Sequence, residues 1–136
     1  MLFRSDGGAH VGTICDASFP TTLLTLWCRD RTRGEKLTVE HVVRSQCRET
    51  ARTVGLDDRG VLAPGYRADL NLVDFDGLRL HAPRLVFDLP AGGKRLLQDV
   101  DGYRHTFVAG TETYVDGEPT GALPGRLVRG AQPSPA

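Results

Sequence analysis

Asp6 and His10 are the residues whose types and spacing point most directly to chemistry. Asp6 follows a short apolar stretch and precedes Gly7 and Gly8, so it would lie at the C-terminal end of a strand, where α/β barrels carry catalytic groups. His10 comes four residues later and could share a metal or bind a substrate carboxylate. Each also has a structural explanation. An aspartate before glycines is commonly a turn residue, and a loop histidine can serve purely as a hydrogen-bonding group.

A wider metal site is an alternative that the sequence leaves open. Cys15 and Asp16 could join Asp6 and His10, or His10 and Cys15 could form a small zinc site, although nothing in the spacing enforces the geometry. The other histidines have no second ligand at a useful spacing, so we expect them to be surface or packing residues. They are His41, His81 and His105.

The balance of charge excludes several classes of function. Lys+Arg and Asp+Glu each number 17, so the formal net charge is zero and no electrostatic footprint for nucleic acid or an anionic membrane surface exists. No apolar run approaches the ~18 residues that a membrane span requires, and the start has no signal-peptide core. The three cysteines form no CxxC pair, which indicates reduced thiols. We therefore expect a cytoplasmic protein that binds neither nucleic acid nor membrane.

Two helices are predicted after a strand end and loop at residues 1–12. The first has Ser18 as a capping candidate, a proline in its first turn and a broad apolar face, and it should stop before Gly34. The second has Thr38 as its capping candidate and apolar residues at helical spacing up to Gly55. These helices would follow the candidate site directly in the chain.

Beyond about residue 60 the sequence changes to short β-rich pieces. Strands are predicted within residues 70–75, 106–109 and 113–115, and Asp-Gly at 116–117 predicts a tight hairpin turn. The proline-containing tail at 131–136 is expected to be disordered. A strand end, two helices and then a run of strands indicate two structural contexts rather than a continuous βαβ array.

Three stretches together carry a family resemblance. Residues 5–10 (SDGGAH) resemble the segment that closes the last barrel strand of D-aminoacylase-like amidohydrolases. Residues 58–74 (DRGVLAPGYRADLNLVD) resemble the entry into the small β-domain of the amidohydrolase superfamily. Residues 116–129 (DGEPTGALPGRLVR) are similar to the ending of N-acyl-D-amino-acid deacylases. Their order and spacing also agree with that family.

The resemblance implies an α+β fold. Residues 1–58 would be the last strand and helices of a metal-dependent TIM-barrel hydrolase, residues 59–130 a small β-sandwich-like domain, and residues 131–136 the disordered tail. In such enzymes the aspartate that corresponds to Asp6 lies beside zinc or another divalent metal and transfers a proton during hydrolysis of an N-acyl-D-amino acid. His10 would contact the substrate.

The other metal ligands of that family, including its His-x-His pair, are absent from this sequence. We therefore expect this chain by itself to bind no metal and to be inactive, and to associate with a missing N-terminal portion or with itself. Asp69 and Asp74, at predicted strand ends, are expected to cap exposed backbone amides or to lie in solvent rather than to act in catalysis. The rival hypothesis is a non-catalytic β-rich accessory or interaction module left from a truncated amidohydrolase.

Overall fold

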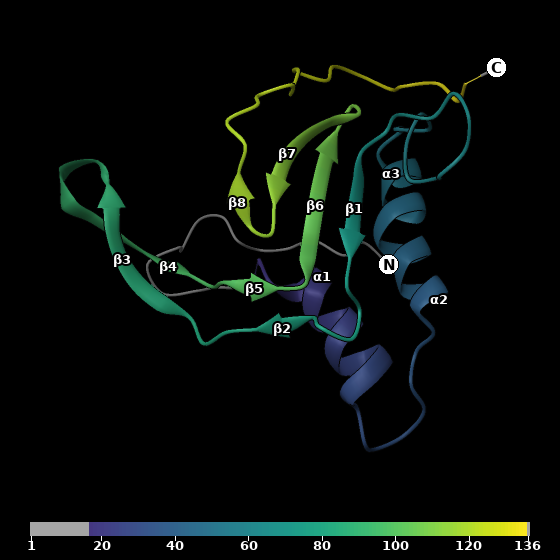
Figure 1. Ribbon diagram of the computed structural model, residues 1–136. Coiled ribbons are helices and arrows are strands. Elements are labelled where there is room, and N and C mark those ends of the chain that lie inside the picture. The colour runs from purple at the N-terminus through teal and green to yellow at the C-terminus, as the bar shows by residue number, and fades with distance from the viewer. Residues whose placement is uncertain (1–16, 136) are drawn as a thin grey trace.

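The computed structural model describes residues 17–135, as two helical segments beside antiparallel strands (Figure 1). The first helical segment runs through α1 (Phe19–Thr22) into the π-helical η1 (Leu23–Asp30). It ends before Gly34, as predicted. Ser18 occupies the N-cap position, but its side chain makes no capping hydrogen bond because its own backbone is already helical. Its carbonyl oxygen instead accepts the hydroxyl of Thr22 at 3.1 Å.

The second helical segment has the ends that the sequence predicts. It comprises α2 (Val39–Arg44), η2 (Ser45–Glu49) and α3 (Thr50–Thr53). The Thr38 hydroxyl accepts the backbone N–H of His41 at 3.2 Å, which satisfies one of the unpaired donors of the first turn. Gly55 follows with φ +75°, and the next N–H, of Leu56, donates to the Ala51 carbonyl. This pairing closes the helix in the Schellman pattern.

A four-stranded antiparallel sheet lies beside the helices in the order β1-β6-β7-β8. Asp116 and Gly117 both have positive φ, at 47° and 85°, and form the turn between the last two strands. The hairpin predicted there is confirmed, as are the three predicted strands. The strands are β1 (Leu70–Val73), β6 (Tyr103–Val108), β7 (Thr111–Val115) and β8 (Glu118–Pro119).

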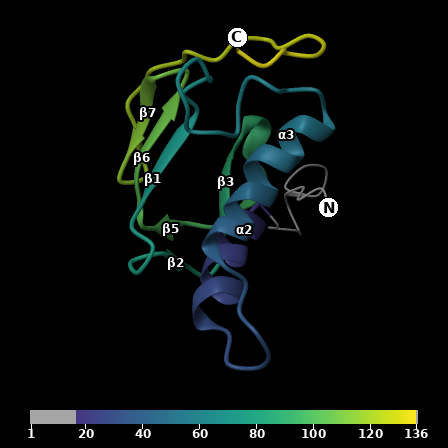
Figure 2. The same cartoon turned by 90° about the vertical axis from the view of Figure 1, so that its right-hand side faces the viewer.

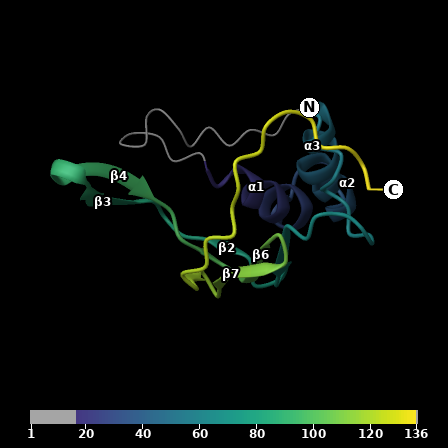
Figure 3. The same cartoon turned by 90° about the horizontal axis from the view of Figure 1, so that it is seen from above.

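Residues 79–101 form a long two-stranded ribbon that we call the arm. It pairs β2 with β5 near the sheet and β3 with β4 beyond it, with the turn η3 at its tip. Figures 1 and 3 both show the β3–β4 end pointing away from the helices. No local sequence pattern indicated the arm. Its ranges are β2 (Arg79–Leu80), β3 (Arg84–Leu89), η3 (Pro90–Gly92), β4 (Gly93–Leu97) and β5 (Val100–Asp101).

The core of the described part is small. Its buried apolar side chains are Val42, Ala51 and Leu78, joined by three buried threonines. Many large apolar side chains on the helices, the arm and the C-terminal segment stay exposed, including Leu26, Phe87 and Leu123. The described chain therefore exposes more large apolar side chains than the scattered single ones that are normal on the surface of a folded domain.

Arg29 joins the first helical segment to the strands. Its guanidinium donates to the carbonyl oxygens of Phe75 at 2.6 Å, Asp76 at 3.1 Å and Leu78 at 2.8 Å. A hydroxyl pair, Thr21 with Tyr103 at 2.9 Å, adds a second link. Figure 2 shows the helices packed along one side of the strands. The two contexts expected from the sequence are thus connected by specific polar contacts.

The expected barrel strand falls within residues 1–12, outside the described residues. The sheets of residues 17–135 are antiparallel. The boundary between 58 and 59 remains a prediction, and contacts cross it. In the tail, where disorder was expected, the backbone of Gln132 pairs with Leu56 in a parallel bridge.

Among the described residues, no helix is long and apolar enough to cross a membrane.

Candidate functional site

The residues predicted to do chemistry lie outside the part of the chain that the structure describes. Asp6 and His10, with the alternative ligands Cys15 and Asp16, precede residue 17. Their roles therefore stay predictions.

Two of the described histidines, His81 and His105, belong to surface polar pairs, and the third, His41, is exposed on α2. His81 Nε2 lies 2.8 Å from a carboxylate oxygen of Asp101, and His105 Nδ1 lies 2.6 Å from one of Glu112. Within residues 17–135, no three His, Cys, Asp or Glu side chains gather in a group that could hold a metal ion. A divalent metal does not fit the described residues, and any site for one would draw on other parts of the protein.

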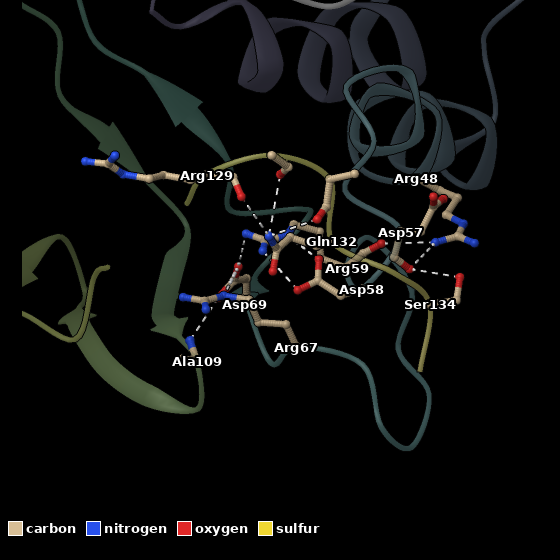
Figure 4. Close-up of polar contacts among 12 residues, drawn as sticks. Arg48, Asp57, Asp58, Arg59, Arg67, Asp69, Ala109, Arg129, Gln132 and Ser134 are labelled. Carbon is tan, nitrogen blue, oxygen red and sulfur yellow. Dashed lines mark hydrogen bonds and ion pairs between the residues drawn. The ribbon is translucent and has the colours of Figure 1, made fainter. Parts of the chain in front are cut away.

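The densest polar arrangement lies in the loop between α3 and β1, and we call it the loop cluster. It consists of Asp58, Arg59, Arg67 and Asp69 (Figure 4). The Arg59 guanidinium donates to both carboxylate oxygens of Asp58, at 2.8 and 3.0 Å, and lies 3.5 Å from Asp69. Arg67 donates to Asp69 at 2.8 Å. The Arg59 guanidinium beside Asp58 holds the pKa of that carboxyl below its usual value.

The loop cluster holds the sheet in place. The Asp69 carboxylate accepts the backbone N–H of Ala109 at 2.8 Å, and the carbonyl of Ala68 accepts that of Gly110 at 2.9 Å. Ala109 has φ +51°, so these bonds fix the tight turn between β6 and β7. Asp74, at the other end of β1, accepts the N–H of Gly77 at 3.0 Å. The prediction that Asp69 and Asp74 cap backbone amides is confirmed.

The other side of the loop is bound to the helix and to the C-terminal segment. Arg48 donates to the carbonyl oxygens of Asp57 at 3.2 Å and Arg59 at 3.3 Å, and its guanidinium stacks over Tyr66 at 5.5 Å. The Asp57 N–H donates to the Gln132 carbonyl at 2.8 Å. Figure 4 shows the Arg48 side chain beside Asp57 of this loop. The loop therefore connects helix, sheet and C-terminal segment.

An open groove of about 490 Å³ lies between α3 and this loop. Its wall is apolar, from Ala51, Val54 and Leu56, and Cys47 is its only sulfur group. Cys47 is exposed by its surface area, but local desolvation of its thiol raises the pKa of that thiol above its usual value, which disfavours the nucleophilic thiolate. Arg59 at its edge is already paired with aspartates. The groove thus lacks an activated nucleophile and is better suited to packing than to catalysis.

A second open groove, of about 590 Å³, lies at the end of the first helical segment. The Arg31 guanidinium covers the Trp27 ring at 4.4 Å, and Arg29 is paired with Asp30 at 2.7 Å. By its sequence alone the basic stretch 29–33 (RDRTR) is typical of a solvated loop, because Asp30 interrupts it and Glu35 and Lys36 follow it. Residues 32–34 are indeed exposed. Arg29, in contrast, connects the first helical segment to the strands through its hydrogen bonds, and nothing in the local sequence indicated that role.

Comparison with known proteins indicates a family for this chain. A family model described as the amidohydrolase family matches residues 1–120. A 5-methylthioadenosine/S-adenosylhomocysteine deaminase of Desulfitobacterium hafniense is 56% identical over 41 residues, which are 30% of this chain and 9% of the deaminase. Adenine deaminase 1 of Rhizobium meliloti is 34% identical over 99 residues, covering 64% of this chain and 18% of that protein.

The chain therefore spans less than a fifth of the length of either relative. No solved structure matches it.

Proposed function

Because the chain belongs to the amidohydrolase family, we propose that it is the C-terminal part of a metal-dependent hydrolase that cleaves carbon–nitrogen bonds other than peptide bonds. The observation that carries this proposal is the family match from residue 1 to residue 120, which includes Asp6 and His10. The polar groups of the described residues form hydrogen bonds that connect the helices, the sheet and the C-terminal segment. These bonds support a positioning role, rather than a chemical one, for residues 17–135.

For the substrate we propose an N-acyl-D-amino acid, whose amide is hydrolysed to a carboxylate and a free amino acid. The three motifs at residues 5–10, 58–74 and 116–129 support this choice. A bound zinc or other divalent ion would supply an activated water. Asp6 would accept a proton from the attacking water and return it to the leaving amine. His10 would contact the substrate.

Hydrolytic deamination is the second candidate reaction. Both relatives described above are named as deaminases, one of 5-methylthioadenosine or S-adenosylhomocysteine and one of adenine. Deamination also breaks a carbon–nitrogen bond with water but releases ammonia, so the products distinguish it from deacylation. The identities extend over 9% and 18% of those two enzymes, so deamination is kept as the second candidate.

We propose further that the metal ligands missing from this chain come from an N-terminal catalytic portion, so that the 136-residue chain is inactive by itself. A non-catalytic module derived from an amidohydrolase is the alternative. It predicts no activity under any condition, with or without upstream sequence.

The test begins with the DNA upstream of the codon for Met1. The longest in-frame protein and the 136-residue chain would both be purified and supplied with zinc. Release of free amino acid from N-acetyl-D-amino acids, and of ammonia from adenine, would then be measured. We expect deacylation by the longer protein alone, and a loss of about 10²–10⁴-fold in Asp6→Asn. Asp76→Asn, a change on an exposed turn, is the matched control and should retain activity.

Metal-dependent deacylation by the 136-residue chain would contradict the proposed division of the site. Ammonia release without deacylation would replace the first reaction by the second. Absence of both activities in the longer protein would favour the non-catalytic module.

A further inference from the structure

The segment 131–135 binds to the loop between α3 and β1 through its backbone. The N–H of Gln132 donates to the Gly55 carbonyl at 2.8 Å, and the Gln132 carbonyl accepts the N–H of Asp57 at 2.8 Å. These two bonds form the parallel bridge between Gln132 and Leu56. Figure 1 shows the segment, in yellow, passing beside this loop. The arrangement resembles strand addition, in which a peptide pairs with an exposed backbone edge.

The contacts of the segment recur after three residues. Gln132 and Pro135 are half-buried, whereas Ala131, Pro133 and Ser134 are exposed. A polyproline II segment has three residues per turn, so residues 132 and 135 lie on the same face of it. Each proline fixes its own φ and favours extended backbone in the residue before it. The segment therefore presents one face to the loop, and its sequence favours the conformation that does so.

Gly65 provides the surface on which Pro135 lies. Gly65 has φ +85°, and a Cβ there would come within 2.9 Å of the Pro135 Cβ. The proline thus occupies space that a larger residue at 65 would fill. The Ser134 hydroxyl adds a longer bond to the Asp57 carbonyl at 3.4 Å (Figure 4). The loop therefore offers a backbone edge for one residue and a glycine surface for a proline three residues later.

We propose that the loop between α3 and β1 is a docking site for an extended peptide with a free N–H and a proline three residues on, occupied by the chain's own residues 131–135. The Gln132 side chain donates to carbonyls of residues 129–131 of its own segment, so the loop recognises the Gln132 backbone. The docked segment is a reversible strap, because few contacts hold it.

The tether sets the strength that the site must have. A segment joined by a short flexible linker experiences an effective concentration of the order of 1 mM. It stays docked only if the same sequence, as a free peptide, binds the vacant site with a Kd below about 1 mM. Binding requires no catalysis, so the inference stands or falls independently of the proposed hydrolase activity.

NMR relaxation of the Ala131 and Ser134 amides in the full chain tests the docking. We expect these amides to be as rigid as those of β6 and β7 in the wild type. They should become mobile in Gln132→Pro, which lacks the N–H that donates to Gly55. Gln132→Ala is the matched control, because it keeps both backbone bonds, and its segment should stay docked.

The peptide Ala-Gln-Pro-Ser-Pro, which copies residues 131–135, tests the site itself. Added to the full-length Gln132→Pro variant, it should shift the amide signals of Gly55, Asp57 and Gly65 with a Kd below about 1 mM. The wild type should need more peptide for the same shift, because its own segment competes. The peptide Ala-Pro-Pro-Ser-Pro lacks the N–H and should bind more weakly.

Circular dichroism would establish that both variants keep the wild-type fold. Freely moving Ala131 and Ser134 amides in the wild type would overturn the proposal without recourse to any variant. A segment that stays rigid in Gln132→Pro, or that is released in Gln132→Ala, would also overturn it. So would the absence of a saturable shift when excess peptide is added to Gln132→Pro.

Discussion

Gly102 is a position where a single added methyl group should be poorly tolerated. It lies between β5 and β6 with φ +98°. A Cβ there would come within 2.9 Å of the backbone N and Cα of Leu78 and 3.0 Å of the Asp74 carbonyl oxygen. These are backbone atoms, and Leu78 is only 1% exposed. The neighbouring chain cannot give way without moving the small core.

The cost of Gly102→Ala has two parts. A positive φ costs an L-residue about 1–2 kcal/mol, and forcing extra volume into a packed site typically costs about 1–3 kcal/mol. We expect a total loss of about 2–5 kcal/mol in the free energy of unfolding. Gly117→Ala is the matched control, because Gly117 has φ +85° but no atom within 4 Å of the added Cβ. It should lose only the first part, about 1–2 kcal/mol.

Urea unfolding measures the stability of both variants. The fluorescence of Trp27, the only tryptophan, reports on the first helical segment, and circular dichroism reports on the whole chain. Equal losses for the two alanine variants would refute the reasoning, because they would show that the backbone approach at Gly102 adds nothing to the positive φ.

Two further predictions concern a helix cap and an ion pair. Thr38→Ala should lower the free energy of unfolding by about 1 kcal/mol because it removes a capping bond, whereas Ser18→Ala should change it little because Ser18 makes none. Equal effects in urea unfolding would contradict this. The Asp58 carboxyl, with its pKa lowered by Arg59, contributes stability above its unfolded pKa of about 3.9 and loses it as the pH falls through the lower folded value. Unfolding free energies measured from pH 7 to pH 3 should therefore decline below about pH 4, and Asp58→Asn should flatten that decline; an unchanged profile in the variant would count against the pair.

The sequence by itself determined the features that depend on a few neighbouring residues. The cap at Thr38, the end of the helix at Gly55 and the turn at Asp116-Gly117 follow from local backbone preferences, and the structure has all three. Three motifs indicated the family, and the match over residues 1–120 agrees with that superfamily. Asp6 and His10 stay predictions, because the described residues begin after them.

Only the tertiary structure decided which distant groups meet. Arg29 looked like part of a solvated basic loop, yet it binds three carbonyl oxygens more than forty residues away. The arm and the pairing of Gln132 with Leu56 were likewise missed. A local sequence pattern reflects side-chain type and backbone preference. Strand register and long-range hydrogen bonds depend instead on how the whole chain balances the loss of conformational entropy against the burial of apolar surface. That balance left the apolar side chains of β3 exposed.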